Sequence, residues 1–156
     1  MKLAMVFPGQ GSQSVGMMQA YGGIAAVREV LAEASDALDQ DLGKLIAEGP
    51  AEQLNMTVNT QPVMLTAGYA VYRAWISLGG AEPALVAGHS LGEYTALVVA
   101  GVLSFRDALP LVRFRAQAMQ EAVPQGQGAM AAEVAEYHAC FCVSAASSAD
   151  SPVDDF

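Results

Sequence analysis

The feature that most constrains this fold is a serine, Ser90, placed midway between two glycines, Gly88 and Gly92. The apolar run 83–87 before it is typical of a buried strand, and the run 91–100 after it is typical of a helix. The serine therefore lies in a predicted strand-to-helix turn. Such a turn strains the serine backbone and brings the strand close to the helix, so it needs small residues two positions to either side. The glycines meet that need, and the pattern predicts a nucleophile elbow.

The predicted turn also offers a place for developing negative charge. The helix after Ser90 directs its free backbone N–H groups at the serine, and the N–H of Leu91 is placed to hold the oxyanion of a tetrahedral intermediate. A second glycine-rich turn, residues 8–13, follows the apolar run 3–7. Loops at the carboxyl ends of parallel strands share one edge of the sheet, so this turn can complete the oxyanion hole. Taken alone, the Ser90 pattern is also compatible with a solvated turn, and the turn at residues 8–13 with an ordinary strand-to-helix connection.

Four motifs together resemble the malonyl-CoA:acyl carrier protein transacylases, and their order and spacing fit that family over residues 1–132. In chain order they are Phe7-Pro8-Gly9-Gln10-Gly11-Ser12-Gln13, Gln61-Pro62, Gly88-His89-Ser90-Leu91-Gly92-Glu93-Tyr94, and Arg115 followed by Met119-Gln120-Glu121-Ala122-Val123-Pro124.

The resemblance implies a two-step acyl transfer. A serine takes malonyl from coenzyme A and passes it to the phosphopantetheine thiol of acyl carrier protein. The resemblance also implies roles for single residues: Ser90 as the nucleophile, the N–H groups of Gln10 and Leu91 as the oxyanion hole, and Arg115 as the partner of the malonyl carboxylate. The last role fits the chemistry, because a planar guanidinium can hold a carboxylate with two parallel hydrogen bonds.

Three arginines fall within ten positions, Arg106, Arg113 and Arg115. From the residues alone they indicate a solvated basic face, an interpretation that fits the first two better than the third. Ser104 is the predicted cap of the helix that carries them. Pro110 lies inside that helix, removes a backbone hydrogen bond and predicts a kink. The position of the third arginine stays open for that reason.

The family's catalytic base is a histidine, and the chain has two, His89 and His138. Neighbours on a tight turn direct their side chains apart, so His89 is expected to brace the elbow. His138 does not match the family's histidine context and is interpreted as incidental. We therefore expect poor turnover or none, and an inert truncated chain or interaction module that retains the fold stays open as an alternative. A lipase-like hydrolase is a weaker third, because the Gln10 loop and Arg115 do not fit it.

Strand-forming and helix-forming runs alternate over residues 1–132, which predicts an α/β fold with a partial α/β-hydrolase-like parallel sheet flanked by helices. The resemblance implies that the family's ferredoxin-like subdomain and C-terminal half are lacking. Residues 133–156 are predicted to be a divergent acidic tail, either disordered or frameshifted, in which 137–143 can form a strand. Residues 116–156 hold six acidic and no basic side chains, whereas residues 1–115 hold ten acidic and seven basic ones.

The longest predicted helix lies in the middle of the chain and ends near a pair of glycines. Asn59 or Thr60 is its expected cap, since both residue types are favoured at that position. Met64, Val71 and Trp75 recur on one face and are assigned to the core.

Composition excludes several classes of function. A net charge of −9 argues against nucleic-acid binding and disfavours the docking of an acidic acyl carrier protein on this part of the chain. The apolar run 96–103 is far below the ~20 residues of a membrane helix, and the chain shows no signal peptide, so no membrane association and a cytoplasmic location are expected. Cys140 and Cys142 lack further ligands for zinc, so neither a metal nor a disulfide is expected. No cofactor is implied, with malonyl-CoA as substrate.

Overall fold

The chain forms an α/β fold, seen in a computed structural model that describes residues 2–122 and 142–143. Over these residues a small sheet accompanies six α-helices and one short 3-10 helix. In chain order the elements are β1 (Ala4–Phe7), η1 (Gln19–Tyr21), α1 (Ala25–Leu38), α2 (Leu42–Glu48), α3 (Ala51–Leu54), α4 (Thr57–Ser77), β2 (Leu85–Gly88), α5 (Leu91–Val99), α6 (Phe105–Glu121) and β3 (Cys142–Val143).

The sheet has the order β1-β2-β3. Strands β1 and β2 are parallel, as predicted, in a register that pairs Phe7 with Gly88 and so ends both strands at the same edge. Strand β3 falls inside the range 137–143 and pairs antiparallel with β2. The described sheet therefore has the predicted parallel pair, to which β3 adds one antiparallel strand.

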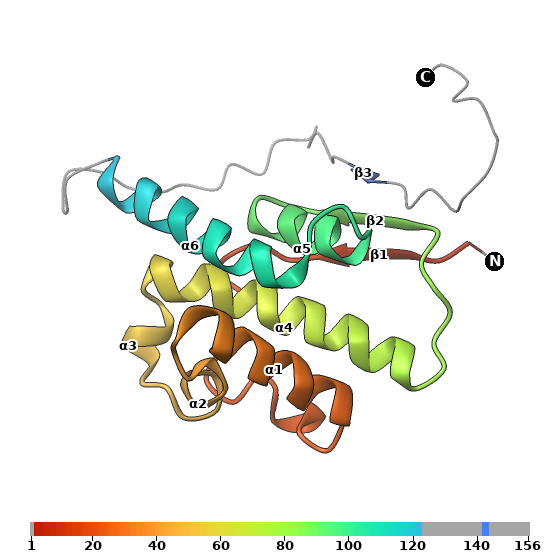
Figure 1. The fold of residues 1–156 in the computed structure, drawn as a ribbon, viewed down its shortest axis with the longest axis horizontal. Helices are drawn as coiled ribbons and strands as arrows, with labels where there is room; N and C mark the ends of the chain where they lie inside the picture. The colour runs from red at the N-terminus through yellow and green to blue at the C-terminus, as the bar shows by residue number, and fades with distance from the viewer. Residues whose placement is uncertain (1, 123–141, 144–156) are drawn as a thin grey trace.

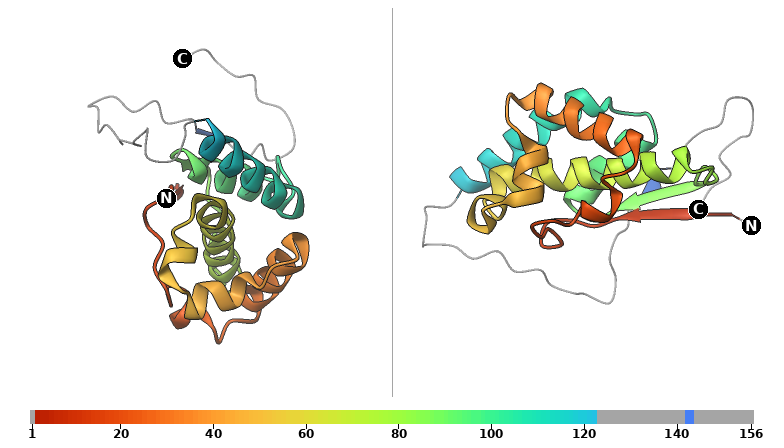
Figure 2. Two further views of the ribbon diagram at one scale, coloured as in Figure 1. Left: turned by 90° about the vertical axis from the view of Figure 1, so that its left-hand side faces the viewer. Right: turned by 90° about the horizontal axis from the view of Figure 1, so that it is seen from below.

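Helices α4, α1 and α2 are layered beneath the two parallel strands (Figure 1). Figure 1 shows β1 and β2 side by side, with α4 below them and α1 and α2 farther below. Helix α5 packs on both strands, and α4 contacts α1, α5 and α6. The end view in Figure 2 places α4 among the other helices, which makes it the central support of the fold.

The core is divided between these layers. The larger cluster lies among the helices and includes Val30 of α1, Leu65 of α4 and Val112 of α6, each almost wholly buried. A smaller cluster joins the strands to α5 through Phe7 and Val86. The smaller cluster holds the carboxyl end of β1, at Phe7, against α5, and this is the edge where the predicted elbow lies.

Helix α4 begins earlier than predicted. It starts at Thr57, and neither Asn59 nor Thr60 caps it. Both side chains instead donate to carbonyl oxygens near the end of α3: Asn59 Nδ2 to that of Gln53 at 2.9 Å, and Thr60 Oγ1 to that of Leu54 at 2.6 Å. The capping prediction is wrong because these polar groups satisfy the preceding helix and not their own.

The expected core face of α4 is only partly buried. Met64 is buried, as predicted, but Val71 and Trp75 are 37% and 42% exposed. The Trp75 ring lies over Gly80 at the end of the helix, and its Nε1 donates to the Ala81 carbonyl oxygen at 2.8 Å. The buried face in this part of the helix is instead formed by Ala70 and Ala74, which are 0% and 2% exposed.

Helix α6 runs from Phe105 to Glu121 without interruption at Pro110. The Ser104 hydroxyl oxygen accepts a hydrogen bond from the backbone N–H of Asp107 at 3.1 Å, which confirms the predicted cap. Arg106 is exposed, as expected. Arg113 is not: it is partly buried and donates to the Leu38 carbonyl oxygen and to Gln40 Oε1, so its assignment to a solvated face is wrong.

Burial also lowers the pKa of the Arg113 guanidinium from its ordinary value. The side chain links α6 to the carboxyl end of α1, where a cation suits the helix dipole.

Candidate active site

Ser90 occupies a strained turn between β2 and α5. Its backbone angles are φ 54° and ψ −110°, a left-handed conformation rarely adopted outside glycine. It directly precedes the helix, yet its side chain does not cap it. The side chain is exposed, and Oγ accepts a hydrogen bond from Arg115 Nη2 at 3.1 Å. Strain of this kind is held at sites where a side chain must be presented to a ligand.

Close backbone packing explains the two glycines. An ideal Cβ on Gly88 would lie 2.0 Å from the backbone carbonyl carbon and oxygen of Gly92. An ideal Cβ on Gly92 would lie 2.1 Å from the carbonyl oxygen of Phe7. Both distances are far inside van der Waals contact, so no side chain fits at either position. Strand β2, helix α5 and the end of β1 therefore meet at one point, as the elbow pattern predicts.

The loop after β1 lies against this point. An ideal Cβ on Gly9 would be 3.0 Å from the His89 carbonyl oxygen, which shows how closely the loop approaches the elbow. Gln10 comes next in the chain, and its side chain donates to Thr57 Oγ1 at 3.2 Å. Leu91 is the first residue of α5, at the amino end of the helix. The fold thus places the Gln10 loop and the first residue of α5 at the same edge of the sheet, next to the elbow.

Arg115 reaches the elbow from helix α6. Its Nη1 donates to Gln61 Oε1 at 2.8 Å, and its Nη2 donates to Ser90 Oγ. The guanidinium carbon also lies 5.7 Å from the centroid of the Tyr94 ring on α5, within cation–π range. Three helices therefore fix one cation beside the serine, and Pro110 does not displace it.

Gln61 and Tyr94 appear in the sequence motifs without a role, and the structure places both against Arg115. Gln61 follows Asn59 and Thr60 in a polar stretch at the start of α4, so its neighbours in the sequence give no signal of its role. Its side chain is fully buried, and buried amides need partners. The partner itself lies 54 positions away and leaves no mark in the local sequence.

Of the two histidines, the structure describes His89 but not His138. His89 is exposed at the elbow beside Ser90, and its backbone carbonyl oxygen accepts from the N–H of Gly92 at 2.9 Å. That bond ties the turn to the first residues of α5. His138 lies outside the described residues, as do Cys140 and most of the predicted acidic tail.

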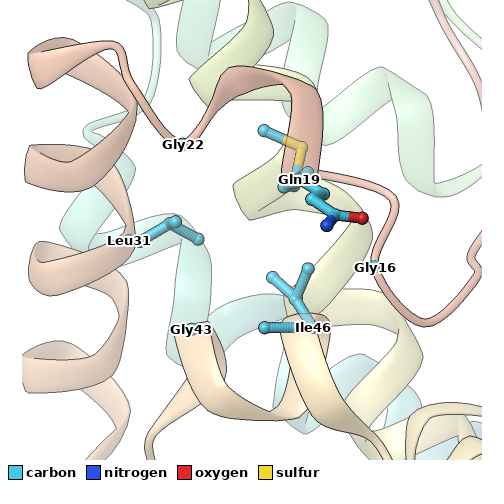
Figure 3. Close-up of a pocket in the computed structure, with 8 residues that line it drawn as sticks. Gly16, Gln19, Gly22, Leu31, Gly43 and Ile46 are labelled. Carbon is cyan, nitrogen blue, oxygen red and sulfur yellow. The ribbon is translucent and has the colours of Figure 1, made fainter.

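A separate cavity of about 300 Å³ lies between η1, α1 and α2. Figure 3 shows Leu31 and Ile46 extending into it, with Gln19 at its rim. None of its lining residues carries a nucleophile or an ionisable group. The candidate chemistry therefore belongs to the Ser90 elbow.

The described part of the chain shows neither a metal-binding cluster nor a membrane-spanning helix. Within residues 2–122 and 142–143, no group of three or more His, Cys, Asp and Glu side chains is placed to hold a metal ion. Over the same residues, no helix combines the length and apolar character needed to cross a membrane.

Sequence comparison defines the class of protein. The acyl transferase domain family matches residues 4–148, and the chain belongs to this family. The match includes both strands that form the elbow edge and every candidate site residue.

Individual relatives narrow the class. The chain is 58% identical over 132 residues to the malonyl CoA-acyl carrier protein transacylase of Escherichia coli (strain K12), covering 84% of this chain and 43% of that protein. A crystal structure of an acyl-carrier-protein S-malonyltransferase from Burkholderia pseudomallei 1710b is 75% identical, with a TM-score of 0.78, over 80% of this chain and 40% of that one. The chain thus spans about two fifths of the length of these relatives.

One solved relative was captured with a partner. A malonyl-transacylase in complex with a type II PKS acyl-carrier protein is 52% identical to this chain, with a TM-score of 0.78, over 81% of this chain and 41% of that one.

Proposed function

We propose that this chain carries the nucleophile-bearing part of an acyltransferase that moves malonyl from coenzyme A to acyl carrier protein through an acyl-enzyme on Ser90. The observation that carries the proposal is the 3.1 Å contact between Arg115 Nη2 and Ser90 Oγ. A fixed cation beside a nucleophilic hydroxyl suits an acyl group that ends in a carboxylate. The names of the relatives and the complex with an acyl-carrier protein support the same substrate and partner.

The first half-reaction forms the acyl-enzyme. Ser90 Oγ attacks the thioester carbonyl carbon of malonyl-CoA, and the new C–O bond gives a tetrahedral oxyanion. The backbone N–H groups of Gln10 and Leu91 hold that oxyanion, aided by the positive end of α5. The C–S bond then breaks, and coenzyme A leaves as the thiol with the proton from the serine.

The second half-reaction returns the enzyme. The phosphopantetheine thiol of acyl carrier protein attacks the Ser90 ester, a C–S bond forms, and the C–O bond to Oγ breaks. The thiol proton returns to the serine oxygen, so the cycle balances without a cofactor.

Arg115 supplies selectivity in this scheme. Its Nη2 contacts Ser90 Oγ in the free chain, and the malonyl carboxylate takes over that side of the guanidinium once the acyl group is attached. An acetyl group has no carboxylate and gains nothing from the cation. Charged hydrogen bonds of this kind contribute about 1.5–3 kcal/mol, which corresponds to about a ten- to hundredfold preference for malonyl.

The same contact also favours a second candidate, an inert chain or interaction module that retains the fold. Arg115 is a hydrogen-bond donor and cannot remove the Ser90 proton. A serine without a general base is a poor nucleophile at neutral pH.

Competition between two thioesters separates the candidates. The chain is incubated with equal concentrations of malonyl-CoA and acetyl-CoA, and the acyl groups bound to it are measured by intact mass spectrometry. We expect malonyl to dominate and Arg115→Ala to lower the malonyl-to-acetyl ratio about ten- to hundredfold. Arg106→Ala, which changes an exposed arginine on the same helix, is the control. An unchanged ratio in Arg115→Ala would move the carboxylate contact elsewhere, and a chain that takes up neither acyl group would favour the inert candidate.

A further inference from the structure

Gln61 is a fully buried amide with a defined partner at each end. Its Oε1 accepts from Arg115 Nη1 at 2.8 Å, and its Nε2 donates to Met119 Sδ at 3.4 Å. The glutamine belongs to α4, and both of its partners lie on α6, four residues apart and thus on one face of that helix. The catalytic scheme above gives Gln61 no role.

We propose that Gln61 is a positioning residue that holds the Arg115 guanidinium toward Ser90 and thereby sets the preference for acyl groups that carry a carboxylate. The inference rests on the proposed function for its second half. Its first half, the holding of the guanidinium, depends on geometry alone.

Hydrogen-bonding capacity fixes the orientation of the amide. A guanidinium only donates, so the oxygen of Gln61 must face Arg115. A thioether sulfur only accepts, so the amide nitrogen must face Met119. A reversed amide would set two donors against each other on one side and two acceptors on the other, in a site with 0% exposure. The Met119 sulfur therefore helps to fix the orientation of the Gln61 amide, and the amide oxygen in turn holds the Arg115 guanidinium.

A neutral holder suits the task better than a carboxylate. Arginine has many rotamers, and a free one would spend little time beside the serine. A glutamine restricts those rotamers while leaving the positive charge for the substrate. A glutamate would restrict them equally well but would pair with the charge. The Tyr94 ring supports the other side of the guanidinium without neutralising it.

Side-chain NMR of the full chain tests the holding role without any activity. The ¹⁵N-labelled Arg115 guanidinium signal is assigned by its loss in Arg115→Lys. We expect slowly rotating, separately resolved Nη hydrogens in the unmodified chain and in Gln61→Glu, which keeps an acceptor. Gln61→Met fills a similar volume without one and is expected to give averaged, fast-rotating signals. Gln117→Met, an exposed glutamine on α6, is the matched control. Identical Arg115 signals in Gln61→Met and Gln117→Met would overturn the inference.

A second variant covers a failure to fold. Met119→Leu keeps an apolar side chain but removes the sulfur acceptor, so the amide loses one of its two partners and the Arg115 Nη groups are expected to rotate faster than in the unmodified chain. Rigid Arg115 signals in this variant would contradict the locking role of the sulfur.

Acyl competition tests the selectivity half. Gln61→Met is expected to lower the malonyl-to-acetyl ratio about tenfold because the cation is no longer aimed, and Gln61→Glu to lower it similarly because the charge is paired. A mobile Arg115 with an unchanged ratio would overturn the selectivity role. If the unmodified chain takes up no acyl group, the proposed function fails, and the NMR result still decides whether Gln61 holds Arg115.

Discussion

Replacing Gly88 by alanine tests how closely the elbow is packed. The added Cβ would lie 2.0 Å from the Gly92 carbonyl carbon and oxygen and 2.3 Å from the Glu93 nitrogen, whereas ordinary van der Waals contact begins at 3.4 Å. All three atoms are backbone, so no side chain can rotate away. Helix α5 must shift by more than an ångström relative to β2. Overpacking a tight core costs about 1–3 kcal/mol and occasionally more, and we expect the upper end or beyond here.

Urea denaturation followed by circular dichroism measures this cost. Gly23→Ala is the matched control, because an ideal Cβ there has nothing within 4 Å and no positive φ is recorded for that residue. A loss of about 3 kcal/mol is a large share of the 5–15 kcal/mol typical of a whole domain, so Gly88→Ala is expected to unfold at a much lower urea concentration. Equal midpoints for the two variants would refute the close approach of β2 and α5.

Two further predictions concern the cap of helix α6 and the exposed edge of the sheet. Ser104→Ala removes the cap of α6 and is expected to cost about 1 kcal/mol of unfolding free energy, measured by the same denaturation, with no loss if the cap is not formed in solution. Val6 is 69% exposed on β1, which is an edge strand in the described sheet. Val6→Lys should therefore reduce concentration-dependent association in sedimentation velocity, and an unchanged sedimentation profile would show that this edge does not drive association.

Local chemistry made the elbow predictable. The glycines at positions 88 and 92 indicate that two backbone segments pass close together. The apolar run before Ser90 and the helical run after it identify these segments as a strand and a helix. The same holds for Ser104, whose capping partner lies three residues away. Contacts of this kind are encoded within a few positions, so one sequence is enough to find them.

Contacts that cross from one element to another escaped prediction. Asn59 and Thr60 resemble helix caps but satisfy carbonyl groups at the end of the preceding helix. Arg113 resembles a surface cation but donates to groups at the carboxyl end of α1, more than seventy positions earlier. The buried Gln61 gives no sign in the sequence that Arg115 is its partner. In each case the partner is chosen by tertiary packing and not by local spacing.

The most direct test of the account is the identity of the acylated residue. The chain is incubated with malonyl-CoA, digested, and mapped by tandem mass spectrometry beside Ser90→Ala and the neighbouring control Ser104→Ala. Because the strained elbow presents the Ser90 hydroxyl to Arg115, we predict one malonyl ester on Ser90, absent from Ser90→Ala and retained in Ser104→Ala. Labelling can be slow without a general base, so long incubations are included. An adduct that persists at equal yield in Ser90→Ala would contradict the assignment of the nucleophile and the mechanism built on it.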